Sequence, residues 1–79
     1  MATKAQHAPH YRKLPAILKE MREEAGLTQR ELGKRMGKPQ SWIHNCETAN
    51  RRVDLGEFVE WCRASGISPQ EGLKRFLKS

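Results

Sequence analysis

The side chains best suited to chemistry in this sequence are cations, and they gather in the middle of the chain. Residues 28–52 hold six of them against two acids, Glu31 and Glu47, which leaves a local charge of +4 within a whole-chain charge of +6. A surplus of this size on a short chain is typical of proteins that bind a polyanion, most simply nucleic acid. The alternative is a charged face that is only solvated. The six cations are Arg30, Lys34, Arg35, Lys38, Arg51 and Arg52.

The other reactive side chains do not form a catalytic or metal-binding set. His7, His10 and Tyr11 have no carboxylate or thiol beside them, so they are weak metal ligands and no metal or other cofactor is expected. Cys46 and Cys62 lack metal-ligand spacing and are expected to be small core residues. Because the sequence also lacks a catalytic triad, a catalytic carboxylate pair and a phosphate-binding loop, we expect that the protein is not an enzyme.

The length of the chain, 79 residues, suits a single domain. A domain of this size buries only about 60% of its unfolded surface, which leaves no room for an enzyme cleft between two lobes. The chain has neither the roughly 20 apolar residues of a membrane span nor the apolar segment of a secretory signal. We therefore expect a cytoplasmic protein with reduced thiols. Residues 1–12 are polar and aperiodic, which predicts a flexible basic arm ahead of a domain over residues 13–79.

The spacing of apolar residues predicts an all-α domain of five helices with short connections. Side chains that cap the starts of the second, fourth and fifth helices are expected at Thr28, Asp54 and Ser68. Each helix carries an apolar stripe at helical spacing, and these stripes are expected to form the core. The stripes are Leu14, Ile17, Leu18 and Met21; Leu32 and Met36; Ile43 and Cys46; Leu55, Phe58, Val59 and Cys62; and Leu73, Phe76 and Leu77.

The expected second and third helices are short and separated by a tight turn, which is the pattern of a helix-turn-helix. Gly37 permits the left-handed backbone that such a turn requires. Gly33 is expected where the two helices cross, because a side chain at that point would hold them apart. The alternative is an ordinary helical hairpin, which uses similar glycines and apolar stripes.

Residues 26–37, which read GLTQRELGKRMG, resemble the signature of phage-repressor-like DNA-binding domains, also called XRE-type domains. Residues 39–43, PQSWI, are similar to the start of that family's recognition helix, and Glu47 matches a glutamate near the end of that helix. Residues 51–64 resemble the continuation found in one subgroup, and the resemblance as a whole covers residues 14–77. It implies a compact lambda-repressor-like domain with a central helix-turn-helix.

The resemblance also implies that the third helix enters the major groove of duplex DNA while the second crosses the backbone. Gln40 would then pair with adenine, and Gln29 would donate its amide to a phosphate. Capping or exposure is the alternative for Gln40, and exposure is the alternative for His44 and Asn45. Trp42 is left between stacking on the DNA backbone and packing against the fourth helix or arginine side chains. The implied base contacts are Gln40, Ser41, His44 and Asn45, and the implied phosphate contacts are Gln29, Lys38, Arg51 and Arg52.

Three departures from the family pattern bear on the fold and on the operator. Gly33 stands where alanine is usual, at a cost of about 1 kcal/mol in helix propensity. Residues 44–46 replace a common Ser-Lys-aliphatic run, so a contact made by that lysine is lost and a different operator is expected. The pattern has glycine followed by Glu or Lys where this chain has Ala49 and Asn50, and we expect Asn50 to take the left-handed conformation.

These features together predict a sequence-specific transcriptional regulator, a repressor of the phage or prophage kind, that binds a palindromic operator and so lies with the nucleoid in the cytoplasm. We expect a homodimer, since two copies reach adjacent major grooves about 34 Å apart. The alternative is an antitoxin or protein-interaction module that neutralises a toxin partner. The expected dimer interface consists of Leu73, Phe76 and Leu77, extended by Ile67 and Trp61, although these residues can also simply close the monomer's core.

Overall fold

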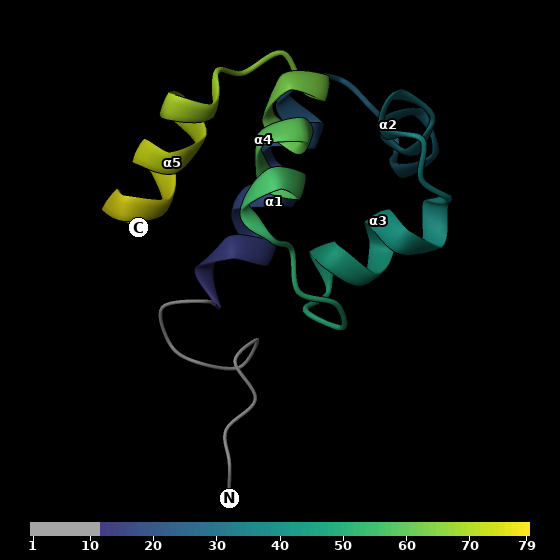
Figure 1. Cartoon of the computed structure of the whole chain (residues 1–79), viewed down its shortest axis with the longest axis horizontal. Helices are drawn as coiled ribbons and strands as arrows, with labels where there is room; N and C mark the ends of the chain where they lie inside the picture. The colour runs from purple at the N-terminus through teal and green to yellow at the C-terminus, as the bar shows by residue number, and fades with distance from the viewer. Residues whose placement is uncertain (1–11) are drawn as a thin grey trace, which may run out of the picture.

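The computed structural model describes residues 12–79, and the arm expected over residues 1–12 lies outside that range except for Arg12. Figure 1 shows α1 and α4 crossing at the centre, with α2 and α3 on one side and α5 on the other. The described part of the chain contains no strand, and the expected all-α, five-helix class is confirmed. None of its helices is long and apolar enough to cross a membrane. The helices are α1 (Lys13–Glu24), α2 (Gln29–Met36), α3 (Gln40–Glu47), α4 (Leu55–Ala64) and α5 (Pro69–Lys78).

The helix ends follow local chemistry. Thr28 and Asp54 each accept a hydrogen bond from the backbone N–H three residues later, and Glu31 and Glu57 return the bond to the capping residue. The backbone and side-chain bonds with Thr28 lower the pKa of Glu31. Ser68 caps α5 by accepting a hydrogen bond from the backbone N–H of Glu71 at 3.1 Å. The three predicted caps are therefore confirmed.

The core fills the space between α1 and α4 and is closed by one face each of α2 and α3. Trp61 is its largest member: the indole is fully buried, and Nε1 donates to the backbone oxygen of Leu18 at 3.0 Å. The expectation that Trp61 extends an exposed patch is therefore wrong, because α4 turns this side chain toward α1. The buried apolar residues are Leu14, Ile17, Leu18, Met21, Leu32, Ile43, Cys46, Val53, Phe58, Trp61 and Cys62.

Three leucines from the predicted stripes lie outside the core. Leu55, at the first position of α4, is 75% exposed, and Leu73 and Leu77 on α5 are 47% and 71% exposed. The placement of Leu55 in the core is wrong, since the residues that α4 buries are Phe58, Trp61 and Cys62, further along the helix. An open apolar hollow lies between the start of α4 and α5, and both Leu55 and Leu73 line it.

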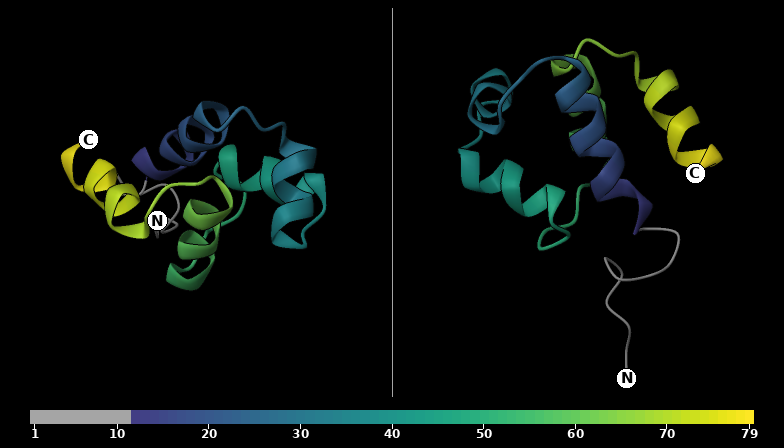
Figure 2. Two further views of the ribbon diagram at one scale, coloured as in Figure 1. Left: turned by 90° about the horizontal axis from the view of Figure 1, so that it is seen from above. Right: turned by 180° about the vertical axis from the view of Figure 1, so that it is seen from behind.

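The α5 helix packs against α1 and α4 at one end of the domain (Figure 2), and it does so through a glycine that the helical spacing did not single out. A Cβ on Gly72 would stand 2.4 Å from the Sγ of Cys62 and 3.1 Å from the ring of Phe58, so only glycine lets α5 approach α4 this closely. Polar contacts fasten the same helix to α1. Arg75 binds Glu24 through two nitrogens at 2.8 and 3.0 Å, and this hydrogen bonding lowers the pKa of Glu24.

The turn between α2 and α3 uses two glycines for different reasons. Gly37 has φ +70°, the left-handed conformation that the tight turn was expected to require. Gly33 has an ordinary helical backbone, but a Cβ there would lie 2.5 Å from the backbone oxygen of Lys38. The obstacle is thus the carbonyl of the turn rather than the facing helix, which corrects the reason predicted for this glycine. Even alanine at Gly33 would force the turn to move.

The turn after α3 departs from the sequence prediction by one residue. Ala49, not Asn50, occupies the left-handed region, with φ +65°. Instead, Asn50 donates its backbone N–H to the Asn45 carbonyl at 2.9 Å, which closes the end of α3. A residue with a Cβ, other than Asn or Asp, pays a steric penalty of roughly 1–2 kcal/mol in this conformation.

We predict that Ala49→Gly stabilises the domain by about 1 kcal/mol, because relief of the left-handed strain outweighs the added freedom of the unfolded chain. In a thermal unfolding experiment the midpoint should rise by about 4–8 °C for a domain of this size. Ala16→Gly, at an exposed position within α1, is the matched control and should lower stability by about 1 kcal/mol. Equal losses in the two variants would show that Ala49 is unstrained.

Candidate nucleic-acid interface

The α3 helix has one face locked into the core and another open to solvent. Ile43 and Cys46 are 0% and 1% exposed, and they fix the helix against α1 and α2. Gln40, Ser41 and His44 lie on the exposed side. Three of the four predicted base-contacting side chains are therefore presented outward on a rigid element, which is the arrangement that groove reading needs.

A buried ion pair ties this helix to α1. The Nε and Nη2 atoms of Arg22 donate to the two carboxylate oxygens of Glu47 at 2.6 and 3.0 Å, and Nη1 donates to the backbone oxygen of Leu27 at 2.7 Å. The side chains are only 9% and 2% exposed. The hydrogen bonds that Arg22 donates to Glu47 raise the pKa of Arg22, so the guanidinium stays charged. Such a two-pronged bond fixes geometry as well as charge.

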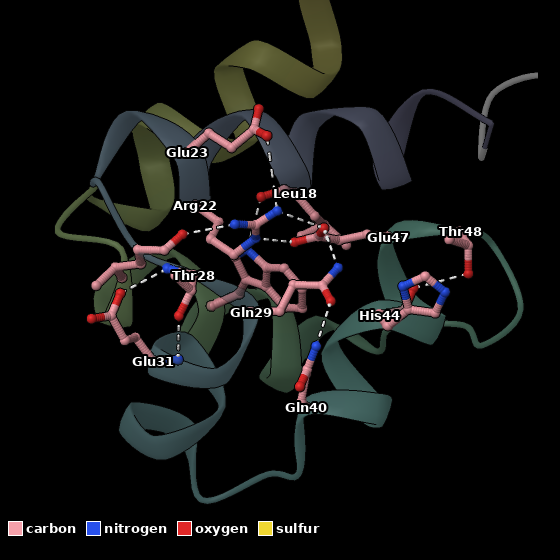
Figure 3. A network of polar contacts seen from close by, with 12 residues as sticks. Leu18, Arg22, Glu23, Thr28, Gln29, Glu31, Gln40, His44, Glu47 and Thr48 are labelled. Carbon is pink, nitrogen blue, oxygen red and sulfur yellow. Dashed lines mark hydrogen bonds and ion pairs between the residues drawn. The ribbon is translucent and has the colours of Figure 1, made fainter.

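A chain of amides continues from this pair to the first residue of α3. The Nε2 of Gln29 donates to Glu47 Oε1 at 3.0 Å, and the Nε2 of Gln40 donates to Gln29 Oε1 at 3.4 Å (Figure 3). Gln29 was predicted to donate its amide to a phosphate, and one of its two N–H groups is committed to Glu47 instead. Gln29 therefore contacts both Glu47 and the predicted adenine-binding residue Gln40.

Two of the predicted phosphate contacts, one at each end of α3, lie against the same aromatic ring. The Nζ of Lys38 lies 4.9 Å from the ring centroid of Trp42, and the guanidinium carbon of Arg51 lies 5.2 Å from it. Arg51 also donates to Glu57 at 3.1 Å. Trp42 therefore packs against basic side chains and also near Trp61 of α4, so both of the packing alternatives that the sequence left open are present. Arg52 is exposed in the same loop.

An open groove runs between α3 and the loop that follows it. Asn45 lines this groove. Its backbone oxygen accepts hydrogen bonds from the backbone N–H groups of Asn50 and Arg51 in the loop, at 2.9 and 3.1 Å. The predicted base and phosphate contacts at Ser41, Asn45, Arg51 and Arg52 are thus brought together. The full lining is Pro39, Ser41, Trp42, Asn45, Asn50, Arg51 and Arg52.

A second hollow lies at the start of α2. One of the basic side chains that line it was not among the predicted DNA contacts. Arg30 lines it together with Thr28, Gln29 and Gln40. Arg30 is exposed in the first turn of α2, where the helix presents backbone N–H groups. Its position next to Gln29 and inside the most basic segment was the signal that could have identified it.

The remaining candidates do not add a site. His7, His10 and Tyr11 lie outside the described residues, and within those residues no group of three His, Cys, Asp or Glu side chains could hold a metal. Cys46 and Cys62 are buried free thiols, as predicted. Burial raises the pKa of Cys46 to about 12, so this thiol stays protonated and unreactive at neutral pH.

Comparison with known proteins places this geometry among relatives. Residues 14–73 match the model of a family described as "Helix-turn-helix domain". An XRE-family like protein from Pseudomonas syringae is 40% identical over 91% of this chain and 88% of its own, with a TM-score of 0.83. The clp gene regulator ClgR from C. glutamicum is 25% identical over 82% and 84%, with a TM-score of 0.75.

A third solved structure is also similar. The restriction-modification controller protein C.AhdI from Aeromonas hydrophila is 30% identical over 76% of this chain and 91% of its own, with a TM-score of 0.69. A search of curated protein sequences gives no match. Together with the five helices of the structure, these matches confirm the expected family and fold.

We predict that Glu47→Gln destabilises the domain by about 3–5 kcal/mol, because it leaves the Arg22 guanidinium buried without its counter-charge. The double variant Arg22→Met/Glu47→Leu should recover most of that loss, since no buried charge remains. Urea unfolding of the single and double variants measures both free energies. Glu60→Gln, at an exposed position on α4, is the control and should change stability by less than about 0.5 kcal/mol. A double variant as unstable as the single one would contradict this account.

Proposed function

The chain belongs to the XRE-like family of helix-turn-helix DNA-binding regulators, and from that membership we propose that it binds an operator in duplex DNA and represses transcription there. The observation that carries the proposal is the α3 helix itself. Its inner residues Ile43 and Cys46 are locked in the core, while Gln40, Ser41 and His44 face outward. An α-helix held in this way fits the major groove, about 12 Å wide.

Base readout is assigned to the exposed residues of α3. Gln40 can bond adenine N6 and N7 through both ends of its amide, and its contact with Gln29 limits the directions that the amide samples. Ser41 lies beside it and can bond either edge. His44 and Asn45 follow one turn later, where they reach the next base pairs.

Phosphate binding is assigned to the cations around α3. Lys38 precedes the helix, and Arg51 and Arg52 follow it, so the three flank the readout residues from both sides. Gln29 and Arg30 lie at the start of α2, where the remaining N–H of the glutamine and the guanidinium can bind a further phosphate. Phosphate contacts of this kind set the register of the protein on the duplex without reading sequence.

Repression is the proposed mode of regulation because occupancy alone blocks other proteins from the same DNA, and the described surfaces account for occupancy. We propose that the protein acts in the cytoplasm, bound to the nucleoid. No metal or cofactor is required by this mechanism, and none of the roles assigned to these residues is a catalytic step.

A homodimer is the proposed form on DNA. One small module buries roughly 600–1,000 Å², which is little for a specific site in a genome. Leu73 and Leu77 are 47% and 71% exposed on α5, and Phe76 is half-buried beside them. Self-association through these residues would bury apolar surface and align two α3 helices on a palindrome. An antitoxin would bind its toxin partner through an exposed apolar surface of the same kind. Neutralisation of a partner protein is therefore the second candidate function.

The experiment that tests DNA binding is selection of bound sites from a random duplex pool, followed by affinity measurements at several salt concentrations. A palindromic consensus is expected. The logarithm of the binding constant should fall linearly with the logarithm of salt concentration, by about 0.9 for each phosphate neutralised. Recovery of no consensus, together with binding that does not depend on salt, would overturn the proposal.

We predict that Gln40→Ala weakens binding to the selected site by about 1–3 kcal/mol and relaxes the preference at one base pair. The reason is loss of a two-point contact to a base edge. Fluorescence anisotropy with the selected duplex and with each single-base variant measures both effects. Gln70→Ala, at an exposed position on α5, is the matched control and should leave affinity and preference unchanged. Full retention of base discrimination in Gln40→Ala would remove this residue from the readers.

We predict that Leu77→Lys converts a dimer into a monomer at micromolar concentration, because a charge would be desolvated in the interface. Sedimentation velocity of the free protein and of its complex with a palindromic duplex measures the assembly. Ala16→Lys, which adds the same charge at an exposed position on α1, is the control and should remain dimeric. A wild-type protein that stays monomeric both free and on the palindrome would contradict the dimer and favour a role for this surface in binding another protein.

A further inference from the structure

We propose that Trp42 is a positioning residue for DNA binding, which holds Lys38 and Arg51 in place as a pair of phosphate contacts. This inference rests on the proposed function, and it assigns to the indole a task that neither base readout nor core packing requires. The ring acts as a shared platform for two cations that come from opposite ends of the recognition helix.

The geometry places both cations within the range of a cation–π interaction. Lys38 belongs to the turn before α3 and Arg51 to the loop after it, yet both charged groups lie about 5 Å from the Trp42 ring, at 4.9 and 5.2 Å from its centroid. Such contacts act within about 6 Å of the ring centroid, and tryptophan is the strongest aromatic partner.

The platform itself is anchored to the core. Trp42 is half-buried, and its ring lies 6.2 Å from the ring of Trp61 at an interplanar angle of 38°. Trp61 is fully buried and hydrogen-bonded to the Leu18 carbonyl of α1. Because α1 and α4 hold Trp61, the position of the Trp42 ring, and of the two cations above it, is set by the centre of the domain.

A neutral ring suits this task better than a carboxylate does. A carboxylate partner would hold a lysine in place but would also cancel its charge and compete with an incoming phosphate. Within the described part of the chain, Lys38 forms no ion pair with a carboxylate, and its ammonium lies over the ring of Trp42. Arg51 shares its guanidinium between Trp42 and Glu57, which leaves part of its donor set for DNA.

The physical benefit is a lower entropic cost of binding. Lysine and arginine side chains lose much rotamer freedom when they are fully immobilised. A ring that already confines them reduces the part of this cost that falls on complex formation. Trp42 also lines the groove between α3 and residues 50–52, so its edge borders the space that a DNA backbone would occupy.

The test compares Trp42→Leu with Trp42→Phe, each alone and combined with Arg51→Ala, on a selected operator and on a scrambled duplex of the same length. Trp42→Leu should weaken binding to both duplexes about tenfold with little change in their ratio, because the loss concerns phosphates. Trp42→Phe, which retains an aromatic face, should restore most of the affinity. Arg51→Ala should cost about tenfold in the wild type but only about twofold in the Trp42→Leu background.

Two controls separate positioning from stability and from charge. Cys62→Ala, a buried substitution between α4 and α5, should lower the free energy of unfolding without changing affinity at temperatures where the variant is folded. Arg63→Ala removes an exposed cation that lies in the last turn of α4 and is not among the residues assigned to DNA, and it should leave affinity nearly unchanged. A second measurement needs no DNA. Acrylamide quenching of tryptophan fluorescence should increase in Lys38→Ala and Arg51→Ala, because Trp42 loses its cover while Trp61 stays buried.

The outcomes distinguish the inference from the proposed function. If the wild type binds the duplexes with a salt-dependent affinity but Arg51→Ala costs the same with and without the indole, Trp42 is not a platform. Unchanged quenching in both cation variants would overturn the inference as well. If the wild type binds neither duplex while the quenching result is as expected, the platform exists and the proposed function is what fails.

Discussion

The buried bond between Arg22 and Glu47 is the constraint on which the rest of the structure depends. It joins α1, the central helix, to the last residue of α3, and its two charges can remain in the interior only while both helices keep their places. Because Glu47 also binds Gln29, and Gln29 binds Gln40, the pair determines the geometry of the first residue of the recognition helix as well as the last. Stability and the presentation of the DNA-binding face are therefore set by the same contacts.

The two faces of α3 are supported in different ways. On the side of α1 and α2 the support combines the buried apolar residues Ile43 and Cys46 with the directional hydrogen bonds of Glu47. On the side of the following loop it is aromatic: Trp61 in the core holds Trp42, and Trp42 holds the two flanking cations. A helix of eight residues has too little stability of its own to define such positions, so tertiary contacts must supply them.

The sequence predicts features that depend on neighbouring residues and fails on features that depend on distant ones. The caps at Thr28 and Asp54 are predictable because a side chain three residues away completes each of them. Trp61 was misplaced because helical spacing does not reveal which neighbour covers a given face. Gly72 was overlooked because its importance comes from Cys62, ten residues away on another helix. The left-handed residue was displaced to Ala49 because backbone bonds from Asn50 close the helix first.

The candidate site shows the same difference between features set by neighbouring residues and features set by distant ones. The residue types and their order along α3 follow from the sequence and its family resemblance, but the partnership of Gln29 with Glu47 and the stacking of Lys38 and Arg51 on one ring do not.

The central claim is that α3 and its flanking cations form the DNA-binding surface. Titration of the ¹⁵N-labelled protein with a selected duplex, followed by amide chemical shifts, tests it directly. The account predicts the largest shifts over residues 38–45 and 50–52 and at the start of α2, whereas shifts confined to α4 and α5 would contradict it.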